Sequence, residues 1–430
     1  MSPALPGYEQ AAAIVASRIA QLCPLRPSSE GVELALAAGR VLAQPLIADR
    51  DQPPFARSTR DGYACRASEA SSHRKLALIG SSRAGEAPAG PLTSRAAWEI
   101  MTGAPVPEGA DAVIMLEHVE LAQGQVRLLP PRTVKPGDNI VSQGVQARQG
   151  DELLPAGTPI QFGQIALAAA CGYAALDVFV RPRVAILTTG DELAPVDSSP
   201  GPGQIRNSNA PMLAALVTAA GGDPWVLPTA ADTAQALDSA LAQAADADML
   251  LISGGVSAGK FDLVEPALAR AGARFHFIGV RIQPGKPLVF GELPVGNMHT
   301  QGKNGTICVF GLPGNPVSSA VTFLLFAAPV LAALSGSRQS PPRFAWARFA
   351  SPAGKHSKKD LTRFLPAFCT FGAMAGQLPE VSLVPMQGSG DLPALARSNC
   401  FLVIPEGAPP IDAGAVVRIL QLQNHGRLTS

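Results

Sequence analysis

The stretch VAILTTG at residues 184–190 is a short apolar run that ends in a polar turn containing glycine. Two later stretches repeat this design, DMLLISGG at 248–255 and TICVFGLPG at 306–314. Segments with the composition of helices accompany them, beginning with NAPMLAALVTAAGG at 209–222. Short apolar runs that alternate with helices are typical of βαβ units. Residues 181–335 are therefore expected to form an α/β domain whose parallel sheet is doubly wound, with helices on both faces.

Each apolar run leads into a polar loop: TTGDE at 188–192, SGGVSAGKFD at 253–262 and GLPGNP at 311–316. Ligands of doubly wound sheets bind beyond the carboxyl ends of the strands, so all three loops are expected at one edge. The glycines of the middle loop would let backbone N–H groups approach an anion, and the helix N-termini that follow add partial positive charge. The arrangement predicts a site for a phosphorylated ligand, although each loop by itself is also readable as a plain turn.

Charged side chains near these loops suit such a ligand. Two lysines, Lys260 and Lys286, could neutralise a phosphate or an incoming oxyanion. Carboxylates beside a phosphate site suit Mg²⁺, which prefers oxygen ligands, and four could reach this edge: Asp191, Glu192, Asp232 and Asp262. The alternative for each carboxylate is a helix cap or a solvated surface charge, and for each lysine a solvated side chain.

The region before the α/β segment has two textures. Residues 8–22 and 162–172 each read as a helix, and we expect the two helices to pack together in one discontinuous linker domain formed by residues 1–44 and 147–180. Between these parts, residues 45–146 are broken by proline and glycine into short apolar runs. That pattern predicts a small β-rich insertion domain.

After the α/β segment, the polar stretch SGSRQSPP at 335–342 leads into short strand-like runs, so residues 341–430 are expected to form a second small β domain. The uncharged stretch Val317–Leu334 comes close to the length of a membrane span. It contains serine, threonine and proline and follows a turn, so we interpret it as a core helix and predict no membrane span. No basic segment precedes an apolar core at the N-terminus, and no signal peptide is expected.

Composition narrows the function classes. The chain of 430 residues carries 34 Lys and Arg against 33 Asp and Glu, a net charge of +1, and 5% of its residues are aromatic. No global field attracts nucleic acid or an anionic membrane, and few rings can stack on bases, so no nucleic-acid partner is expected. The six cysteines and six histidines are dispersed without a CxxC pair, which argues against zinc and iron–sulfur sites. The thiols are interpreted as buried packing in a reducing, cytoplasmic compartment.

Taken alone, Asp61 and Thr102 are readable as turn residues. Eight segments in this order nevertheless resemble the molybdopterin molybdenumtransferase family, which includes MoeA and the E domain of gephyrin. They extend over all four regions and are PPFARSTRDGYA (53–64), IMTGAPVPEGADAVIMLE (100–117), TTGDEL (188–193), GQIRNSN (203–209), SGGVSAGKFD (253–262), QPGKP (283–287), GLPGNPVS (311–318) and QGSGDLPALARSNCFLVIPEG (387–407). An ordered set of this kind is far more specific than any single loop.

The resemblance implies an elongated homodimer whose subunits have four domains: a discontinuous helical linker domain, a β-rich insertion, a molybdopterin-binding α/β domain and a C-terminal β-barrel. It implies the last step of molybdenum cofactor assembly, in which adenylylated molybdopterin is cleaved, AMP leaves, and molybdate is inserted into the dithiolene with the help of Mg²⁺. Further partners consistent with the resemblance are the molybdopterin adenylyltransferase and molybdoenzyme chaperones.

The resemblance also assigns roles to residues at matching motif positions. The pocket for the pterin and its phosphate would be formed by Gly190, Asp191, Asp232, Ser253, Gly254, Gly255, Ser257, Pro313, Gly314, Asn315 and Pro316, with Arg363 and Ser389 from the C-terminal domain. Catalysis would involve Glu192, Asp262 and Lys286, joined by Asp61 and Thr102 from the insertion of the partner subunit. The metal ion would be held by Glu192, Asp232 and Asp262.

The chain departs from the family pattern at two places. VSQGVQ at 141–146 stands where relatives often read RxxGED, so an expected arginine and an expected acid are missing, and the segment ends in Gln146. Gln283 precedes PGKP at a position that is often lysine. These departures leave open a non-catalytic molybdopterin-binding carrier or scaffold. The α/β region considered alone leaves open an adenylyltransferase that acts on molybdopterin.

Overall fold

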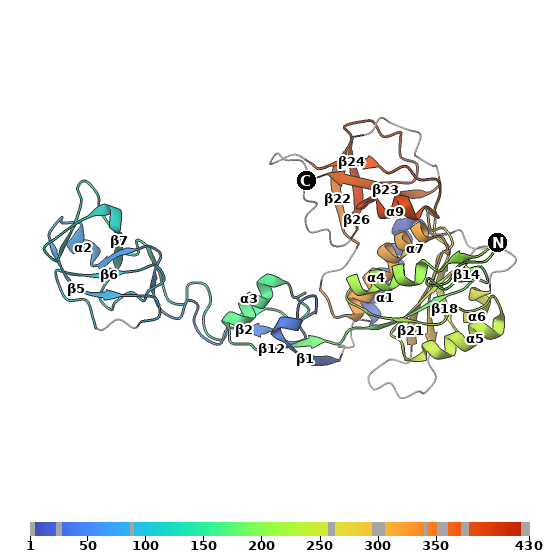
Figure 1. The fold of residues 1–430 in the computed structure, drawn as a ribbon, viewed down its shortest axis with the longest axis horizontal. Helices are drawn as coiled ribbons and strands as arrows, with labels where there is room; N and C mark the ends of the chain where they lie inside the picture. Colours follow the sequence, from blue (N-terminus) through green and yellow to red (C-terminus); the bar gives the residue numbers. More distant parts are fainter. Residues whose placement is uncertain are drawn as a thin grey trace.

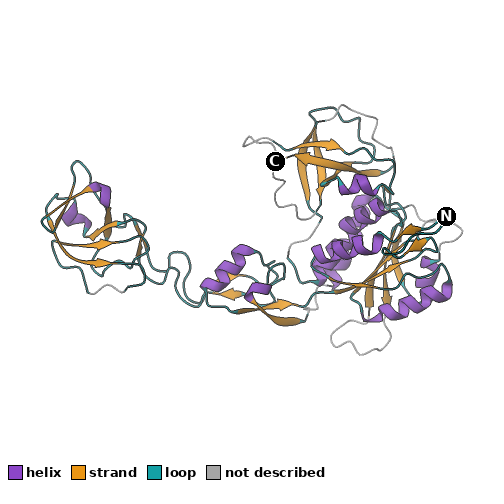
Figure 2. Cartoon of the chain, in the orientation of Figure 1, coloured by secondary structure: helices purple, strands orange, loops and turns teal. Residues whose placement is uncertain are grey.

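The computed structural model describes residues 5–22, 28–86, 90–256, 263–294, 306–338, 342–350, 360–370 and 378–422. The chain is drawn out: a small β-rich body at one end is joined by a thin linker to an α/β body with a barrel beside it (Figure 1). Most helices surround the sheet of the α/β body (Figure 2). We call these parts the insertion (residues 59–139), the linker (29–58 and 140–179), the central domain (183–334) and the barrel (344–421).

The central domain is built on one six-stranded sheet. Its strands lie in the order β16 (Asp223–Val226), β13 (Arg183–Thr188), β17 (Met249–Ser253), β21 (Thr306–Leu312), β20 (Val289–Pro294) and β18 (Arg274–Ile278). The first four strands are parallel, whereas β20 and β18 join antiparallel at the edge. The expected parallel sheet is therefore confirmed for the four strands β16, β13, β17 and β21, and the sheet as a whole is mixed.

Helices cover both faces of this sheet, which confirms the doubly wound architecture. Val184 and Ile186 of β13 point into one core, and the alternate residues Ala185 and Leu187 point into the other, as the period of a strand requires. The first core is covered by α4 (Asn209–Ala219), α1 (Tyr8–Leu22) and the continuous helix formed by α7 (Pro316–Thr322), the π-helical η4 (Phe323–Ala327) and α8 (Ala328–Leu334). The second is covered by α5 (Ala234–Gln243), η3 (Ala244–Asp246) and α6 (Val264–Arg270).

The helix Pro316–Leu334 is the uncharged stretch weighed above as a membrane span. Its 19 residues have a mean hydropathy of 2.1, and 89% of the helix window is buried inside the protein. Buried Val317, Phe323 and Leu331 pack in the first core, between the sheet and α1. The interpretation as a core helix is confirmed.

Helix α1 packs against α8 and η4 of the central domain, although the sequence led us to expect contact with the helix at 162–172. Its buried side Tyr8, Ala11 and Val15 belongs to the first core. The second helix, α3 (Phe162–Ala170), instead buries Ala168 in a small core within the linker. The expected pairing is wrong. The apolar stripe of α1 shows only that one side of this helix is buried, not which element covers it, and the long apolar helix Pro316–Leu334 offers a larger apolar surface than α3 does.

The linker is held by short antiparallel ladders. Two chain segments cross it and pair as β1 (Ser29–Glu33) with β12 (Ala175–Phe179), β2 (Leu46–Ile47) with β11 (Glu152–Leu154), and β3 (Arg57–Ser58) with β10 (Ile140–Val141). The short helix η1 (Leu34–Leu36) packs beside α3. The outward and return segments therefore run side by side to the insertion (Figure 1).

The insertion is β-rich, as expected. Its sheet has the order β7 (Ala112–Met115), β4 (Gly62–Cys65), β6 (Ala96–Ile100), β5 (Leu76–Ser82), β9 (Gln125–Leu128) and β8 (Val119–Ala122), accompanied by α2 (Ala67–Ala70) and η2 (Leu116–His118). Two small cores form around it, one containing Tyr63 and Ile114 and the other containing Ala64 and Trp98.

The C-terminal region forms a closed five-stranded barrel. Strand β23 (Thr362–Thr370) is followed around the barrel by β24 (Glu380–Leu383), β22 (Phe344–Phe349), β26 (Val416–Gln421) and β25 (Cys400–Ile404), and β25 pairs back with β23. Strand β19 (Ile282–Gln283) of the central domain adds to β23 in parallel. The remaining elements are α9 (Leu392–Ala396) and the small ladder of β14 (Leu193–Ala194) with β15 (Ile205–Arg206).

Candidate functional site

Strands β13, β17 and β21 end at one edge of the central sheet. Thr188, the last residue of β13, pairs with Ser253, the last of β17, and Ser253 pairs with Leu312, the last of β21. The loops that follow leave the sheet side by side. This register confirms the common edge expected from the sequence, at the end where doubly wound sheets bind ligands.

These loops line a cavity of about 1100 Å³, which we call the strand-end cavity. Further walls come from residues 282–287 and from the barrel, which contributes Arg363 of β23 and the turn around Ser389. The cavity therefore forms where the central domain meets the barrel. The sequence-predicted residues that line it are Gly190, Glu192, Asp232, Ser253, Gly254, Gly255, Lys286, Pro313, Gly314, Asn315, Pro316, Arg363 and Ser389.

The main chain after β17 requires glycine. Gly254 and Gly255 have φ of +99° and +65°, in the region that disfavours other residues. A Cβ on Gly254 would lie 2.6 Å from the backbone oxygen of Thr189. Without a side chain, this loop runs directly against the loop after β13, and both open onto the cavity.

One amide side chain joins two of the loops. Asn209, at the start of α4, donates through Nδ2 to the Ser253 hydroxyl at 2.9 Å and to the Gly314 carbonyl at 2.6 Å. A second amide joins the third loop to the barrel, since Asn315 Nδ2 donates to the Ser389 hydroxyl at 2.8 Å. The relative placement of the loops and the barrel is thus set by hydrogen bonds at the cavity wall.

Three polar atoms on the cavity wall are buried without a hydrogen-bond partner among the described residues: Thr189 Oγ1, Asn209 Oδ1 and Gln283 Oε1. Buried polar groups in proteins are almost always paired, because an unpaired one costs about 1–3 kcal/mol. The three residues line the cavity, but the unpaired atoms themselves have almost no exposed surface, so a ligand would reach them only if these side chains rotate.

Three carboxylates gather beside the cavity. The backbone N–H of Asp232 donates to Asp191 Oδ1 at 3.1 Å, while Glu192 and Asp232 line the cavity itself. Partial burial, followed by the negative charges of Asp191 and Glu192, raises the pKa of Asp232 above its usual value. No group of three His, Cys, Asp or Glu side chains arranged to hold a metal occurs within the described part of the chain.

Three cationic side chains line the cavity: Arg206 of β15, Lys286 and Arg363. Lys286 is exposed in the loop after β19, and Arg363 is half-buried on β23. Burial lowers the pKa of Arg363, but a guanidinium stays charged at neutral pH. Strand β19 places Gln283 opposite Arg363 in register, so the residue at the family's usual lysine position lies beside a cation already present.

Asp61 and Thr102 form a pair outside the strand-end cavity. Asp61 Oδ1 accepts hydrogen bonds from the Thr102 backbone N–H at 2.6 Å and from its hydroxyl at 2.7 Å. These bonds lower the pKa of Asp61, which is fully exposed. The pair lies at strand ends of the insertion, Asp61 before β4 and Thr102 after β6, at the opposite end of the chain from the barrel (Figure 1).

Three other predicted residues, Ser257, Lys260 and Asp262, lie outside the described residues. The sequence analysis did not assign a site role to several residues that line the cavity, chiefly Thr189, Arg206, Asn207, Asn209 and Gln283. The motif GQIRNSN was the available signal, because it contributes Arg206, Asn207 and Asn209 directly after TTGDEL.

Comparison with known proteins agrees with this arrangement. Three family models match in order: the MoeA N-terminal region (domain I and II) at residues 7–172, the probable molybdopterin binding domain at 185–333, and the MoeA C-terminal region (domain IV) at 350–422. The three matches together extend over most of the chain.

Curated relatives and solved structures align over nearly the whole chain. A molybdopterin molybdenumtransferase of Nostoc sp. is 33% identical over 97% of this chain and 94% of its own, and that of Haemophilus influenzae is 34% identical over 94% and 96%. The crystal structure of the molybdopterin biosynthesis moeA protein from Pyrococcus horikoshii OT3 is similar with a TM-score of 0.78 at 29% identity, over 97% of this chain and 100% of that one. The chain therefore belongs to the molybdopterin molybdenumtransferase family.

Proposed function

We propose that this protein is an enzyme that inserts molybdenum into adenylylated molybdopterin with release of AMP, the last step of molybdenum cofactor biosynthesis. Relatives named for this transferase activity align over nearly the full length. The observation that carries the proposal is the strand-end cavity of about 1100 Å³, because it combines close-running glycine loops, the cations Arg206, Lys286 and Arg363, and the carboxylates Glu192 and Asp232 in one place. No comparison favours the carrier or the adenylyltransferase alternative.

The cations of the cavity suit the cleavage. The P–O bond that breaks joins the phosphate of molybdopterin to the phosphorus of AMP. An oxygen atom from water or molybdate bonds to that phosphorus in its place, and negative charge grows on the departing phosphate oxygen. Lys286 and Arg363 face the cavity from different walls, so they can stabilise that charge without moving during the reaction. Molybdate, the second substrate, is also an anion, and the same two side chains suit its approach.

The carboxylates suit Mg²⁺. Asp191, Glu192 and Asp232 offer only oxygen atoms as ligands, and burial, followed by the negative charges of Asp191 and Glu192, raises the pKa of Asp232. We propose Glu192 and Asp232 as metal ligands, with Asp262 as a third from the loop after β17. Bound there, Mg²⁺ would neutralise charge on the phosphates and on molybdate.

A homodimer is proposed because Asp61 and Thr102 do not line the cavity of their own chain. The arm formed by the linker and the insertion extends away from the central domain (Figure 1), so a second copy could bring this pair to the cavity.

The division of the chain into four domains, 1–44 with 147–180, 45–146, 181–335 and 341–430, stays a proposal. Contacts of this protein with the adenylyltransferase and with molybdoenzyme chaperones are proposed as well.

A reducing, cytoplasmic compartment is proposed on the state of the thiols. Cys65, Cys171, Cys308, Cys369 and Cys400 are free and buried. Burial raises the pKa of Cys65 and of Cys308 to about 12, so these thiols are unreactive at neutral pH. Free buried cysteines are typical of proteins that fold where disulfides are not formed.

The direct test is release of AMP by the purified full chain. With Mg²⁺, molybdate and adenylylated molybdopterin, we expect AMP and a molybdenum-containing cofactor to appear in equal amounts. Omitting molybdate or adding a chelator should stop the coupled reaction. Tight binding of adenylylated molybdopterin without any molybdate-dependent AMP release would contradict the proposal and favour a carrier.

A further inference from the structure

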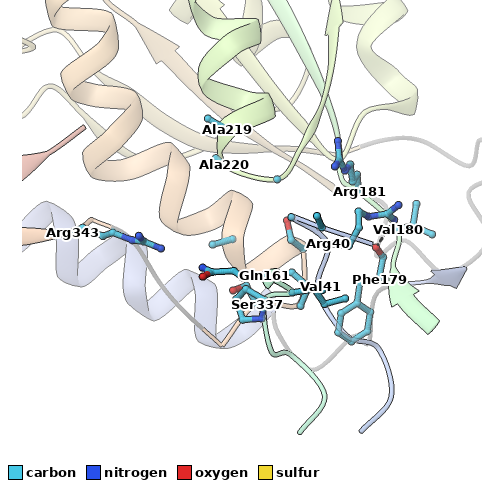
Figure 3. A pocket seen from close by; sticks show the side chains of 17 residues that line it. Arg40, Val41, Gln161, Phe179, Val180, Arg181, Ala219, Ala220, Ser337 and Arg343 are labelled. Atoms are coloured by element: carbon cyan, nitrogen blue, oxygen red, sulfur yellow. Dashed lines mark hydrogen bonds between the residues drawn. The ribbon is translucent and has the colours of Figure 1, made fainter. Parts of the chain in front are cut away.

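A second cavity, of about 470 Å³, lies between the linker and the central domain (Figure 3). Linker residues 38–41, 159–161 and Phe179 form one part of its lining. Another part comes from the central domain: residues 219–221 at and just after the end of α4, Ala332 of α8, and Ser335 and Ser337 after α8. It shares no lining residue with the strand-end cavity. We call it the junction pocket.

The charges on the junction pocket are all of one sign. Its titratable lining residues are Arg40, Arg181 and Arg343, and no Asp, Glu or His is among the lining residues. Arg343 lies at one side of the pocket, and Arg40 and Arg181 lie at the other (Figure 3). Three arginines therefore line one open-sided pocket.

Only one of these arginines has a carboxylate partner among the described residues. Arg40 pairs with Glu30 and donates to the Phe179 carbonyl at 2.9 Å, both through the same terminal nitrogen. Its Nε is buried and has no acceptor in the described part of the chain. Arg181 and Arg343 have exposed side chains with no ion pair or hydrogen bond to a described residue. No carboxylate among the lining residues offsets these like charges, and the orphaned donor adds a further cost.

We propose that the junction pocket binds a small molecule that carries phosphate groups. A guanidinium pairs with either phosphate or carboxylate. A carboxylate is planar, however, and its two oxygens typically pair with the two N–H groups of a single guanidinium. Phosphate presents tetrahedral oxygens, so it can accept from arginines on different sides of a pocket. The walls at Val41, Ile160 and Phe179 are apolar and suit an uncharged portion of the same molecule.

Occupancy of the junction pocket would affect the arm of the protein. Arg40 belongs to the linker, Arg181 precedes β13 of the central domain, and Arg343 precedes β22 of the barrel. A ligand that accepts from all three would join three parts of the chain. The bound ligand would therefore hold the linker, and with it the insertion, at one orientation to the central domain.

The test uses the full chain and pyrophosphate as the probe. Hydrogen exchange should show pyrophosphate-dependent protection of backbone amides at 38–41, 159–161 and 219–221, and titration calorimetry should give an affinity. In the double variant Arg181→Gln/Arg343→Gln this protection should vanish and the affinity of that site should fall tenfold or more, because two charged hydrogen-bond donors to the phosphate are lost. Both arginines are exposed, so the variant should keep the wild-type melting temperature.

Two controls separate this site from other anion binding. Lys286→Gln alters only the strand-end cavity, so it should leave protection at the junction pocket intact. Arg132→Gln removes an exposed charge from the insertion and should change neither readout. Unaltered protection in the double variant, or none in the wild type, would overturn the proposal. Equal protection by citrate would overturn the assignment to phosphate.

Discussion

Asn207 and Asn209 are two residues apart in one motif and act on different structures. Asn207 is 8% exposed, donates to the hydroxyls of Thr188 and Thr229, and accepts from the Ala210 N–H. Asn209 is less buried, lines the cavity, and joins the Ser253 and Gly314 loops. Asn207 therefore completes hydrogen bonds in the protein interior, whereas Asn209 holds two loops of the cavity wall in place.

Alanine variants should separate these roles. Asn207→Ala leaves buried polar groups unpaired and should lower the free energy of unfolding by about 1–3 kcal/mol. Asn209→Ala should leave the free energy of unfolding within about 1 kcal/mol of wild type, because water can replace its exposed bond, while raising KM for adenylylated molybdopterin tenfold or more. Urea unfolding and steady-state kinetics measure the two effects. A stability loss in Asn209→Ala as large as in Asn207→Ala would show that Asn209 is structural.

Lys286 offers a cleaner test of charge at the cavity. It is exposed and lines the cavity wall, so Lys286→Gln should change the free energy of unfolding by no more than about 0.5 kcal/mol. Turnover should fall by about tenfold to a hundredfold, which corresponds to the loss of one charged hydrogen bond to an oxyanion. Lys75→Gln removes an exposed lysine of the insertion and serves as the matched control. Unchanged AMP release in Lys286→Gln would remove this lysine from the mechanism.

At the scale of elements, α1 is fastened to the central sheet by an ion pair as well as by packing. Arg18 of α1 pairs with Glu292 of β20, and His276 of β18 lies with Nε2 3.4 Å from the same carboxylate oxygen. Both Glu292 and His276 are about 10% exposed. Burial, with smaller contributions from Arg18 and Arg274, holds the pKa of His276 below its usual value despite Glu292.

This histidine makes stability depend on pH in a defined window. The unfolded chain takes up a proton near pH 6.5, whereas the folded chain resists it until lower pH, so stability rises with pH through the range just below 6.5 and falls on acidification. His276→Gln should flatten the dependence of the free energy of unfolding on pH between 5 and 7. Urea unfolding at several pH values measures it. An equally steep dependence in the variant would assign the effect to other groups.

At the scale of the whole molecule, the distance between insertion and cavity becomes testable. Asp61 and Thr102 lie in one body and the strand-end cavity in another. In a twofold symmetric dimer, each cavity could receive the pair from the other chain. Two inactive variants, one altered in the pair and one in the cavity, would then complement each other.

We expect Asp61→Asn and Lys286→Gln chains, unfolded together and refolded as a mixture, to recover about a quarter of wild-type AMP release. Half of the dimers would be mixed, and each mixed dimer would hold one intact site out of two. The separate variants, refolded alone, supply the baseline. No recovery in the mixture, together with a dimeric mass, would show that each chain completes its own site.

The sequence by itself determined the order of strands, loops and helices in the central domain, and the β-rich character of both flanking regions. These features are local: apolar runs of strand length and glycine-bearing loops are written in neighbouring residues, and the register of β13, β17 and β21 follows from parallel pairing. The ordered motifs likewise predicted most of the cavity wall.

Only the tertiary structure decided which distant residues meet. Asn209 and Gly314 are 105 positions apart, yet one hydrogen bond joins their loops. Strand β19 joins the barrel and places Gln283 beside Arg363, and α1 packs on the central domain instead of on α3. Which apolar face packs against which, and which buried polar groups pair, depends on every surface that the folded chain brings together. A short stretch of residues cannot show that outcome, because it does not contain the other surfaces.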